Sequence, residues 1–154
     1  MTAVGYRDGV TAADWRTAIR ESAAALVDLG VAGEGYPDAC VAMVERHGPY
    51  IVLAPGLALV HARPEDGGLA VGVTVTRLAS GVPFGHPDND PVDLLLTFCT
   101  PDAEAHVGSL ATLARALSDG LAERLRAASD GTELLTTLKE VFPDAQGGES
   151  GGQR

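Results

Sequence analysis

The apolar run at residues 92–99 is the feature of this sequence that most restricts the possible folds. Asp93 and Thr97 are its only polar members. A strand with so little alternation is typical of the centre of an α/β sheet, where both faces are buried. Thr100-Pro101-Asp102 follows directly, and its capping side chains, its proline and its early acid favour the start of a helix. We therefore expect a central strand that leads at once into a helix.

Periodicity divides the rest of the chain into further helices and strands. Helices are predicted at about 11–30, 36–46, 102–117, 121–128 and 132–141, and strands at 50–53, 57–61 and 69–76. The first ten residues carry no clear pattern, and we expect them to be loose. Helices, then strands, then helices in one short chain predict an α/β sheet that is covered by helices on both faces.

The length of 154 residues fits one domain. We expect this domain to span residues 10–142. The remaining tail, residues 143–154, is rich in glycine and polar residues and offers too little apolar surface to pack. Such a segment is expected to be disordered.

Charge and composition narrow the classes of partner. The formal net charge is −10, which argues against nucleic acid or an anionic membrane as the partner and is compatible with a basic protein surface. Cys40 and Cys99 form no metal-binding or redox motif, and we interpret them as small apolar residues of a reduced interior. With no signal peptide and no membrane span in the pattern, the chain is expected to be cytoplasmic.

Three of the four histidines fall at junctions between the expected elements. His61 ends a strand, His86 lies in a loop rich in Gly, Pro and Asp, and His106 lies in the first turns of the helix after residue 102. Ligand chemistry in α/β sheets gathers at strand carboxyl ends and helix N-termini, so two or three of these imidazoles could converge. His47 follows a helix end, where a cation interacts well with the helix dipole.

The segment GPYIVLAPGLALVHARPEDG, residues 48–67, resembles the phosphohistidine segment of the mannitol/fructose-type (type 2) EIIA domains of sugar phosphotransferase systems, in their ascorbate-type variety. Residues 83–92 resemble the second motif of this family and residues 102–106 the third. Val60 stands where the family usually has proline directly before the histidine. The resemblance implies a mannitol-type fold with a mixed sheet of about five strands, and it extends over residues 10–142.

The resemblance also implies a function. Such a chain is the phosphocarrier component (EIIA) of a phosphoenolpyruvate-dependent system for uptake of ascorbate-type substrates. It accepts a phosphoryl group from phospho-HPr and passes it to the cysteine of an EIIB component, so it meets the membrane component EIIC only indirectly. His61 would be the phosphorylated nucleophile and His106 would stabilise the phosphoryl group. Arg63 and Arg46 are the candidates for phosphate binding and His86 for shaping the site, with no metal or other cofactor.

The implied chemistry suits these residues. A neutral imidazole has a free lone pair near pH 7, so it can accept a phosphoryl group and release it again. Two alternatives stay open. The domain could be regulatory, with phosphorylation of His61 controlling a protein partner, or His61, His86 and His106 could hold a metal in a hydrolase, although they lack the spacing of known motifs.

Overall fold

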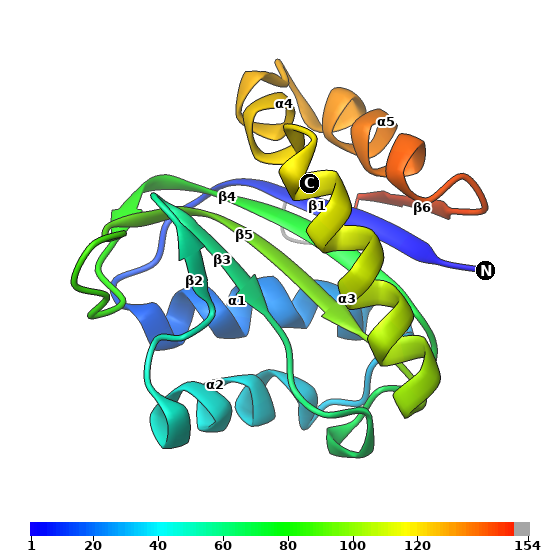
Figure 1. Ribbon diagram of the computed structural model, residues 1–154, viewed down its shortest axis with the longest axis horizontal. Coiled ribbons are helices and arrows are strands. Elements are labelled where there is room, and N and C mark those ends of the chain that lie inside the picture. The colour runs from blue at the N-terminus through cyan, green and yellow to red at the C-terminus, as the bar shows by residue number, and fades with distance from the viewer. Residues whose placement is uncertain (150–154) are drawn as a thin grey trace.

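The computed structural model describes residues 1–149, which form a six-stranded sheet between two layers of helices (Figure 1). The strands are β1 Ala3–Val10, β2 Val52–Ala54, β3 Leu57–Val60, β4 Gly72–Val82, β5 Val92–Cys99 and β6 Gln146–Glu149. Their order in the sheet is β2-β3-β5-β4-β1-β6. The pairs β3–β5, β1–β4 and β1–β6 are parallel, whereas β2–β3 and β4–β5 are antiparallel. The prediction of a mixed α/β sheet is confirmed.

Helices cover both faces of this sheet, as predicted. They are α1 Trp15–Asp28, α2 Tyr36–His47, α3 Ala103–Ser118, α4 Leu121–Ala127 and α5 Gly131–Val141, with a short 3₁₀ turn, η1, at Pro64–Asp66. In Figure 1, α1 and α2 lie below the sheet, and α4 and α5 lie above it. Asp102 is the N-cap of α3, and its carboxylate accepts the N–H of Ala105 at 2.8 Å. Within residues 1–149, no helix has the length and apolar character of a membrane span.

Strand β5 is central, as its composition predicts. Leu95 packs among the buried side chains of α1 and α2, whereas Leu94 and Phe98 pack among those of α3, α4 and α5. Each face of the strand therefore belongs to a different core. This two-sided burial explains why the strand is apolar at nearly every position.

The N-terminal segment is a strand and not a loose end, so the expected domain boundary at residue 10 lies too late. β1 pairs with β4 over residues 3–7 and places Val4 in the core. Its Arg7 is also buried, and the guanidinium bonds the carboxylate of Asp28 at 2.6 Å and the carbonyl O of Glu21 at 2.8 Å. A charged residue can lie in a buried strand when partners satisfy it, and those partners come from α1.

The expected disorder after residue 142 is contradicted for part of the tail. Gln146–Glu149 form β6, which pairs in parallel with residues 3–6 of β1. Edge pairing uses backbone N–H and C=O groups and needs no apolar side chain, so the polar composition of this segment did not reveal it. The expectation for residues 150–154 lies outside the described residues.

The topology fixes which loops share an end of the sheet. Because β3 and β5 are parallel, with Val60 opposite Thr97, the segments after these two strands leave from the same end. His61 follows β3 there, and α3 begins there after β5. The loop at residues 83–91 joins β4 to the start of β5, so it lies at the opposite end.

Candidate active site

His61 lies directly after β3 in a partly buried position. Its Nδ1 is 3.2 Å from the carbonyl O of Leu59. Because a carbonyl can only accept, Nδ1 must carry the proton in this contact. The other ring nitrogen, Nε2, is then the one with a free lone pair.

His106 meets His61 from the first turns of α3. The centroids of the two imidazole rings are 5.6 Å apart. The Nδ1 of His106 lies 3.4 Å from the hydroxyl of Thr100, which is buried between β5 and α3. The structure therefore brings together the two histidines at the end of the sheet where the sequence led us to expect them.

Phe98 forms a common support for both imidazoles. Its ring stacks on His61 with a centroid distance of 5.0 Å and an interplanar angle of 23°, and it lies 5.4 Å from the ring of His106. Phe98 is fully buried, so this support belongs to the core of the domain. Tyr50 completes the surroundings of His61 with an edge-on contact at 6.4 Å.

The environment favours the neutral form of His61. Burial is the largest cause and lowers the pKa of this imidazole below its ordinary value; the nearby His106 lowers it further, while the Leu59 carbonyl acts in the opposite direction. A neutral ring with Nδ1 protonated is a nucleophile at Nε2. The arrangement suits the transfer of an electrophilic group to and from that nitrogen.

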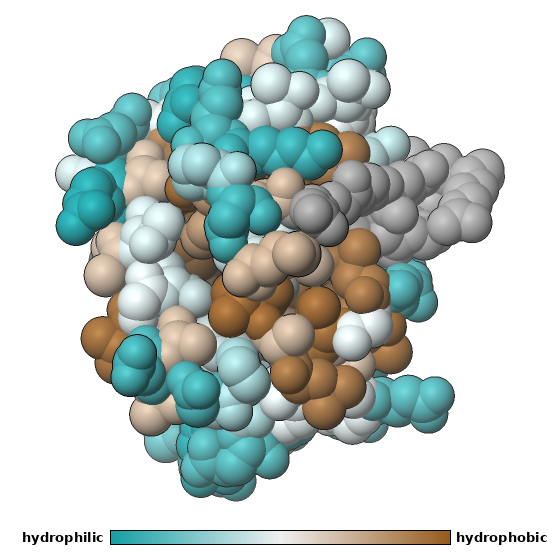
Figure 2. Space-filling model, turned by 90° about the vertical axis from the view of Figure 1, so that its right-hand side faces the viewer, coloured by the Kyte–Doolittle hydropathy of each residue, from teal (hydrophilic) through white to brown (hydrophobic). Residues whose placement is uncertain are grey.

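Exposed apolar side chains occur close to the two histidines. Tyr50, which contacts His61, is 43% exposed, and Val107, which follows His106, is 66% exposed. Leu69, near the start of β4, is 63% exposed. Figure 2 looks onto the side of the molecule toward which β5 points and shows apolar side chains gathered on it. A surface of this kind fits contact with another protein.

Comparison with known proteins agrees with this geometry. The sequence model described as "Phosphoenolpyruvate-dependent sugar phosphotransferase system, EIIA 2" matches residues 7–141. The chain belongs to this family. It is therefore a phosphotransferase component, the A-type phosphocarrier of such a system.

The names of individual relatives give two different substrates, ascorbate and mannitol. The ascorbate-specific PTS system EIIA component of Shigella boydii is 39% identical over 126 residues, which cover 80% of this chain and 82% of that protein. The mannitol-specific cryptic phosphotransferase enzyme IIA component of Escherichia coli is 39% identical over 130 residues, covering 83% and 87%. The structure of mannitol enzyme IIA in complex with phosphorylated enzyme IIB from E. coli has the same fold, with a TM-score of 0.74 at 23% identity, and the match covers 91% of this chain and 99% of that one.

The two candidate arginines of this EIIA chain lie together, and both face Asp66. The guanidinium of Arg63 bonds both carboxylate oxygens of Asp66, at 3.1 and 3.2 Å, and remains 55% exposed. Arg46, from the last turn of α2, lines a cavity of about 60 Å³ together with Arg63 and Asp66. The contacts of Arg63 are thus with a neighbouring carboxylate and not with the imidazole pair.

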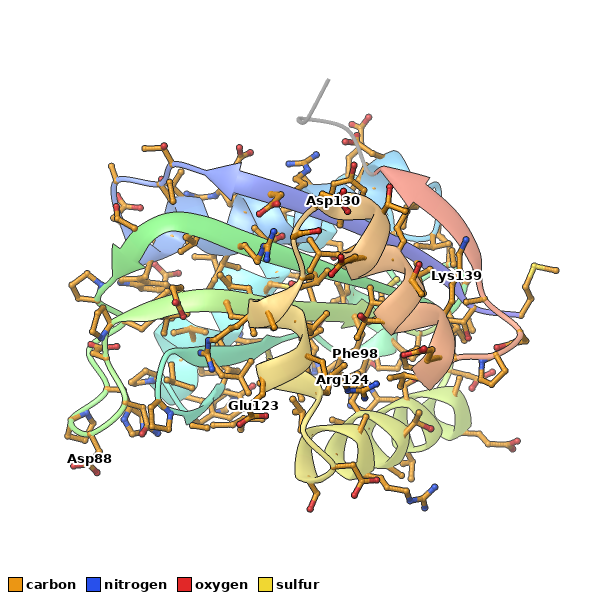
Figure 3. The ribbon with its side chains drawn as sticks, turned by 90° about the horizontal axis from the view of Figure 1, so that it is seen from above. Asp88, Phe98, Glu123, Arg124, Asp130 and Lys139 are labelled. Atoms are coloured by element: carbon orange, nitrogen blue, oxygen red, sulfur yellow. The ribbon has the colours of Figure 1, made fainter. Side chains whose placement is uncertain are left out.

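His86 does not belong to the site, which corrects our expectation that it shapes the entrance. Its Nδ1 accepts the backbone N–H groups of Asp88 and Asn89, at 3.1 and 3.0 Å, so its ring stabilises a turn. That turn precedes β5, whereas Phe98 lies near the other end of the same strand, roughly 20 Å away at 3.3 Å per residue. Asp88 of this turn and Phe98 are clearly separated in Figure 3.

Three residues of the site could not be identified from sequence patterns. Phe98 stood out only as an apolar residue of a buried strand, and Thr100 only as a residue near a helix start. The third, Tyr36, begins α2 and is fully buried, yet its hydroxyl contacts the backbone on either side of the site. Its one sequence signal is that it is one of three tyrosines in a chain with few aromatic residues.

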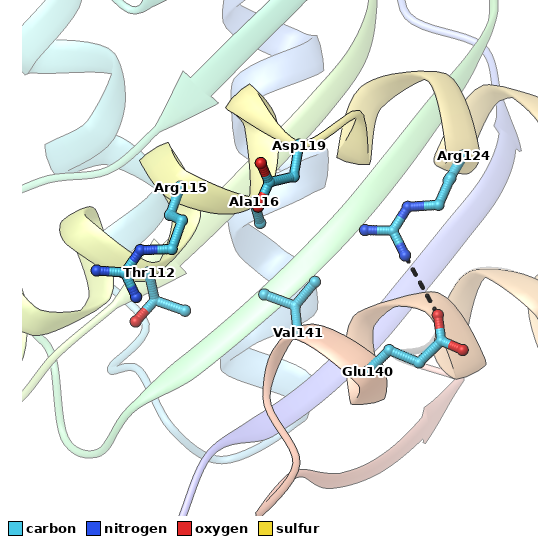
Figure 4. Close-up of a pocket in the computed structure, with 7 residues that line it drawn as sticks. All are labelled: Thr112, Arg115, Ala116, Asp119, Arg124, Glu140 and Val141. Carbon is cyan, nitrogen blue, oxygen red and sulfur yellow. Dashed lines mark hydrogen bonds and ion pairs between the residues drawn. The ribbon is translucent and has the colours of Figure 1, made fainter.

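A cavity elsewhere on the surface does not compete with this site. The cavity in Figure 4, of about 240 Å³, lies between α3, α4 and α5, and Arg124 on its wall is paired with Glu140 at 3.3 Å. Its lining carries two arginines and two carboxylates, so its formal charge is zero. Within residues 1–149, no group of three or more His, Cys, Asp and Glu side chains is arranged to hold a metal ion.

Proposed function

We propose that this EIIA chain carries the phosphoryl group on Nε2 of His61, takes it from phospho-HPr and passes it to the cysteine of an EIIB component. The observation that carries the proposal is the contact between Nδ1 of His61 and the Leu59 carbonyl, 3.2 Å, because it leaves Nε2 as the nucleophile. Burial supports it further, since the lowered pKa of His61 keeps this ring neutral at pH 7.

The transfer step then balances without a proton relay. The lone pair of Nε2 forms the new N–P bond while the P–N bond of the donor breaks, and its electron pair returns to the donor ring. A donor ring that is protonated on its other nitrogen leaves as a neutral imidazole. The proton of His61 stays on Nδ1, and its hydrogen bond to the Leu59 carbonyl stabilises the positive charge that the ring gains. Catalysis of this step is mainly positioning and electrostatics.

His106 is proposed to donate a hydrogen bond to the phosphoryl oxygens. Its Nδ1 can accept the hydroxyl hydrogen of Thr100, at 3.4 Å, and Nε2–H is then the donor. The position in the first turns of α3 adds the favourable field of a helix N-terminus.

Arg46 and Arg63 stay in the proposal as phosphate-binding candidates. Asp66 holds the guanidinium of Arg63 in this structure. The other terminal nitrogen, 3.9 Å from Glu65, is the one that could contact a phosphoryl group while Asp66 stays in place.

The partners follow from the family and the surface. HPr and EIIB are proposed to dock on the apolar side chains around His61, namely Tyr50 and Val107, with acidic residues at the rim. EIIC is proposed to receive the phosphoryl group's effect only through EIIB, and the reaction is proposed to take place in the cytoplasm. The net charge of −10 argues against nucleic acid as a partner. Ascorbate-type uptake is the proposed context.

The test is transfer from phosphoenolpyruvate through the first enzyme of the system and HPr. His61→Ala is expected to abolish labelling, whereas the same substitution at His47 or at His86 leaves it unchanged. Undiminished labelling of the His61 variant would refute the proposal.

A second measurement addresses the sugar and the regulatory alternative. The phosphorylated chain is mixed with purified EIIB components of the ascorbate type and of the mannitol type. We expect rapid transfer to the ascorbate-type cysteine and slower transfer to the other. Efficient phosphorylation of His61 with no transfer to either EIIB would favour a regulatory role.

A further inference from the structure

The hydroxyl of Tyr36 connects the residue after His61 to the strand that carries Phe98. The N–H of Ala62 donates to this hydroxyl at 3.0 Å, and the hydroxyl donates to the carbonyl O of Phe98 at 2.8 Å. Tyr36 is fully buried. The hydroxyl also lies 3.4 Å from the carbonyl O of Ala62, so one side chain contacts the backbone on either side of the site.

The hydroxyl stands where the next hydrogen bond between β3 and β5 would be. Val60 is opposite Thr97, and the Leu59 N–H bonds on the β2 side of the strand. Because N–H groups alternate between the two sides of a strand, the Ala62 N–H faces β5. Continued pairing would bring this N–H directly to the carbonyl O of Phe98. The inserted hydroxyl instead holds the two backbones one oxygen atom apart.

We infer that Tyr36 is a positioning residue for phosphoryl transfer. Its hydroxyl fixes the backbone on the C-terminal side of His61, so the imidazole lies between the ring of Phe98 and the carbonyl of Leu59. This inference rests on the proposed role of His61 as the carrier. Tyr36 acts through its neighbours and does not touch the phosphoryl group, because it is buried and its hydroxyl is occupied by backbone groups of Ala62 and Phe98.

Phe98 connects the Tyr36 hydroxyl to both histidines of the site. Its carbonyl accepts the hydroxyl hydrogen of Tyr36, and its ring contacts His61 and His106 at 5.0 and 5.4 Å. The segment after His61 and the support beneath the two rings are therefore held by one side chain. Without the hydroxyl, Ala62 either moves toward β5 or keeps an unpaired N–H, and in both cases the backbone after His61 loses the group that fixes it.

Tyr36→Phe tests this inference because it removes one oxygen atom. We expect the transfer rate at saturating phospho-HPr to fall by ~10–100-fold, as for a small misplacement of reacting groups, with KM unchanged because the docking surface is intact. Nitrogen-15 NMR of His61 is expected to show a loss of the Nδ1-protonated tautomer. A variant with the wild-type rate and the wild-type tautomer would overturn the inference.

Thr74→Val is the matched control. The Thr74 hydroxyl is also buried, and it donates to the carbonyl O of Ser22 in α1 at 3.3 Å, on the face of the sheet opposite the ring of Phe98. This variant is expected to lower the melting temperature while transfer stays at the wild-type rate. If both variants slow transfer in proportion to their loss of stability, Tyr36 is merely structural and the inference fails.

Two measurements keep the outcome decisive. Should Tyr36→Phe not fold, hydrogen exchange in the unaltered protein decides: the Ala62 amide must exchange slowly, and rapid exchange overturns the inference. The His61→Ala variant separates this inference from the proposed function. Full transfer by Tyr36→Phe with none by His61→Ala removes only the role of Tyr36, whereas full labelling of His61→Ala removes the proposed function itself.

Discussion

Replacing His106 by alanine tests the chemistry of the site most directly. The substitution removes the ring that we propose as a hydrogen-bond donor, which lies 5.6 Å from that of His61. Loss of one donor that stabilises charge in a transition state lowers the rate by ~10²–10³-fold, or about 2.7–4 kcal/mol in the barrier. Stability should change much less, because the ring is only partly buried and alanine favours the helix. The lost contact with Phe98 is worth about 0.5–1.5 kcal/mol.

The assay is rapid-quench transfer from labelled phospho-HPr, with urea unfolding measured on the same preparations. His86→Ala serves as the control, since it removes an identical ring from the opposite end of β5. A His106 variant that transfers within twofold of the wild type would refute our reasoning about this donor. A variant with a large loss of stability would show that His106 is chiefly a packing residue.

Three further predictions concern protonation, the core and the tail. The pKa of His61 is lowered by burial, so an NMR titration should find that its imidazole titrates below pH 6.5. The free energy of unfolding should then decrease as the pH falls below about 6.5, because the unfolded chain binds the proton first. Arg7→Ala should lower the free energy of unfolding by about 2–3 kcal/mol in urea titrations, since it removes two charge-assisted hydrogen bonds from a buried strand, one to a half-exposed Asp28. Deleting residues 143–154 should leave the transfer rate unchanged within twofold, because β6 lies at the edge of the sheet opposite β2 and β3. A much lower transfer rate would show that the tail belongs to the docking surface.

The part of the fold that follows from local pattern could be predicted from the sequence. β5 is recognisable because both of its faces are buried, and the start of α3 because capping residues follow it at once. The convergence of His61 and His106 follows from the same rule, since segments that leave parallel strands share one end of a sheet. Buried strand positions require apolar side chains, so the positions of these strands can be recognised from the residue types.

The parts that were missed depend on pairing between distant segments. The charged Arg7 makes residues 3–10 look unsuitable for a buried strand. Its charge is tolerated there because Glu21 and Asp28 of α1 accept hydrogen bonds from its guanidinium. β6 is held through its backbone pairing with β1, for which the sequence carries no pattern. Neither interaction produces a periodic pattern of apolar residues in the segment concerned.

The error at His86 has a topological cause. The loop at residues 83–91 precedes the strand predicted at 92–99, whereas His106 follows it, so chain order alone places His86 and His106 at opposite ends of that strand. Because β4 and β5 are antiparallel neighbours, the loop between them lies where β5 begins. His61 follows a strand parallel to β5 and therefore lies where β5 ends. The motif at residues 83–92 is a turn motif here, in which Asp90 accepts the backbone N–H groups of Phe84, Gly85 and His86.

Val60 shows how the fold can hold His61 without the proline that the family usually has at this position. Proline fixes its own backbone angle but has no N–H to give to a neighbouring strand. Val60 is almost fully buried and remains in register opposite Thr97. Its N–H lies on the same side of β3 as that of Ala62, toward β5, because the Leu59 N–H bonds on the other side. Pairing with β5 before His61 and the Tyr36 hydroxyl after it thus restrain the histidine from both directions, which takes over the restraint that a proline ring would provide.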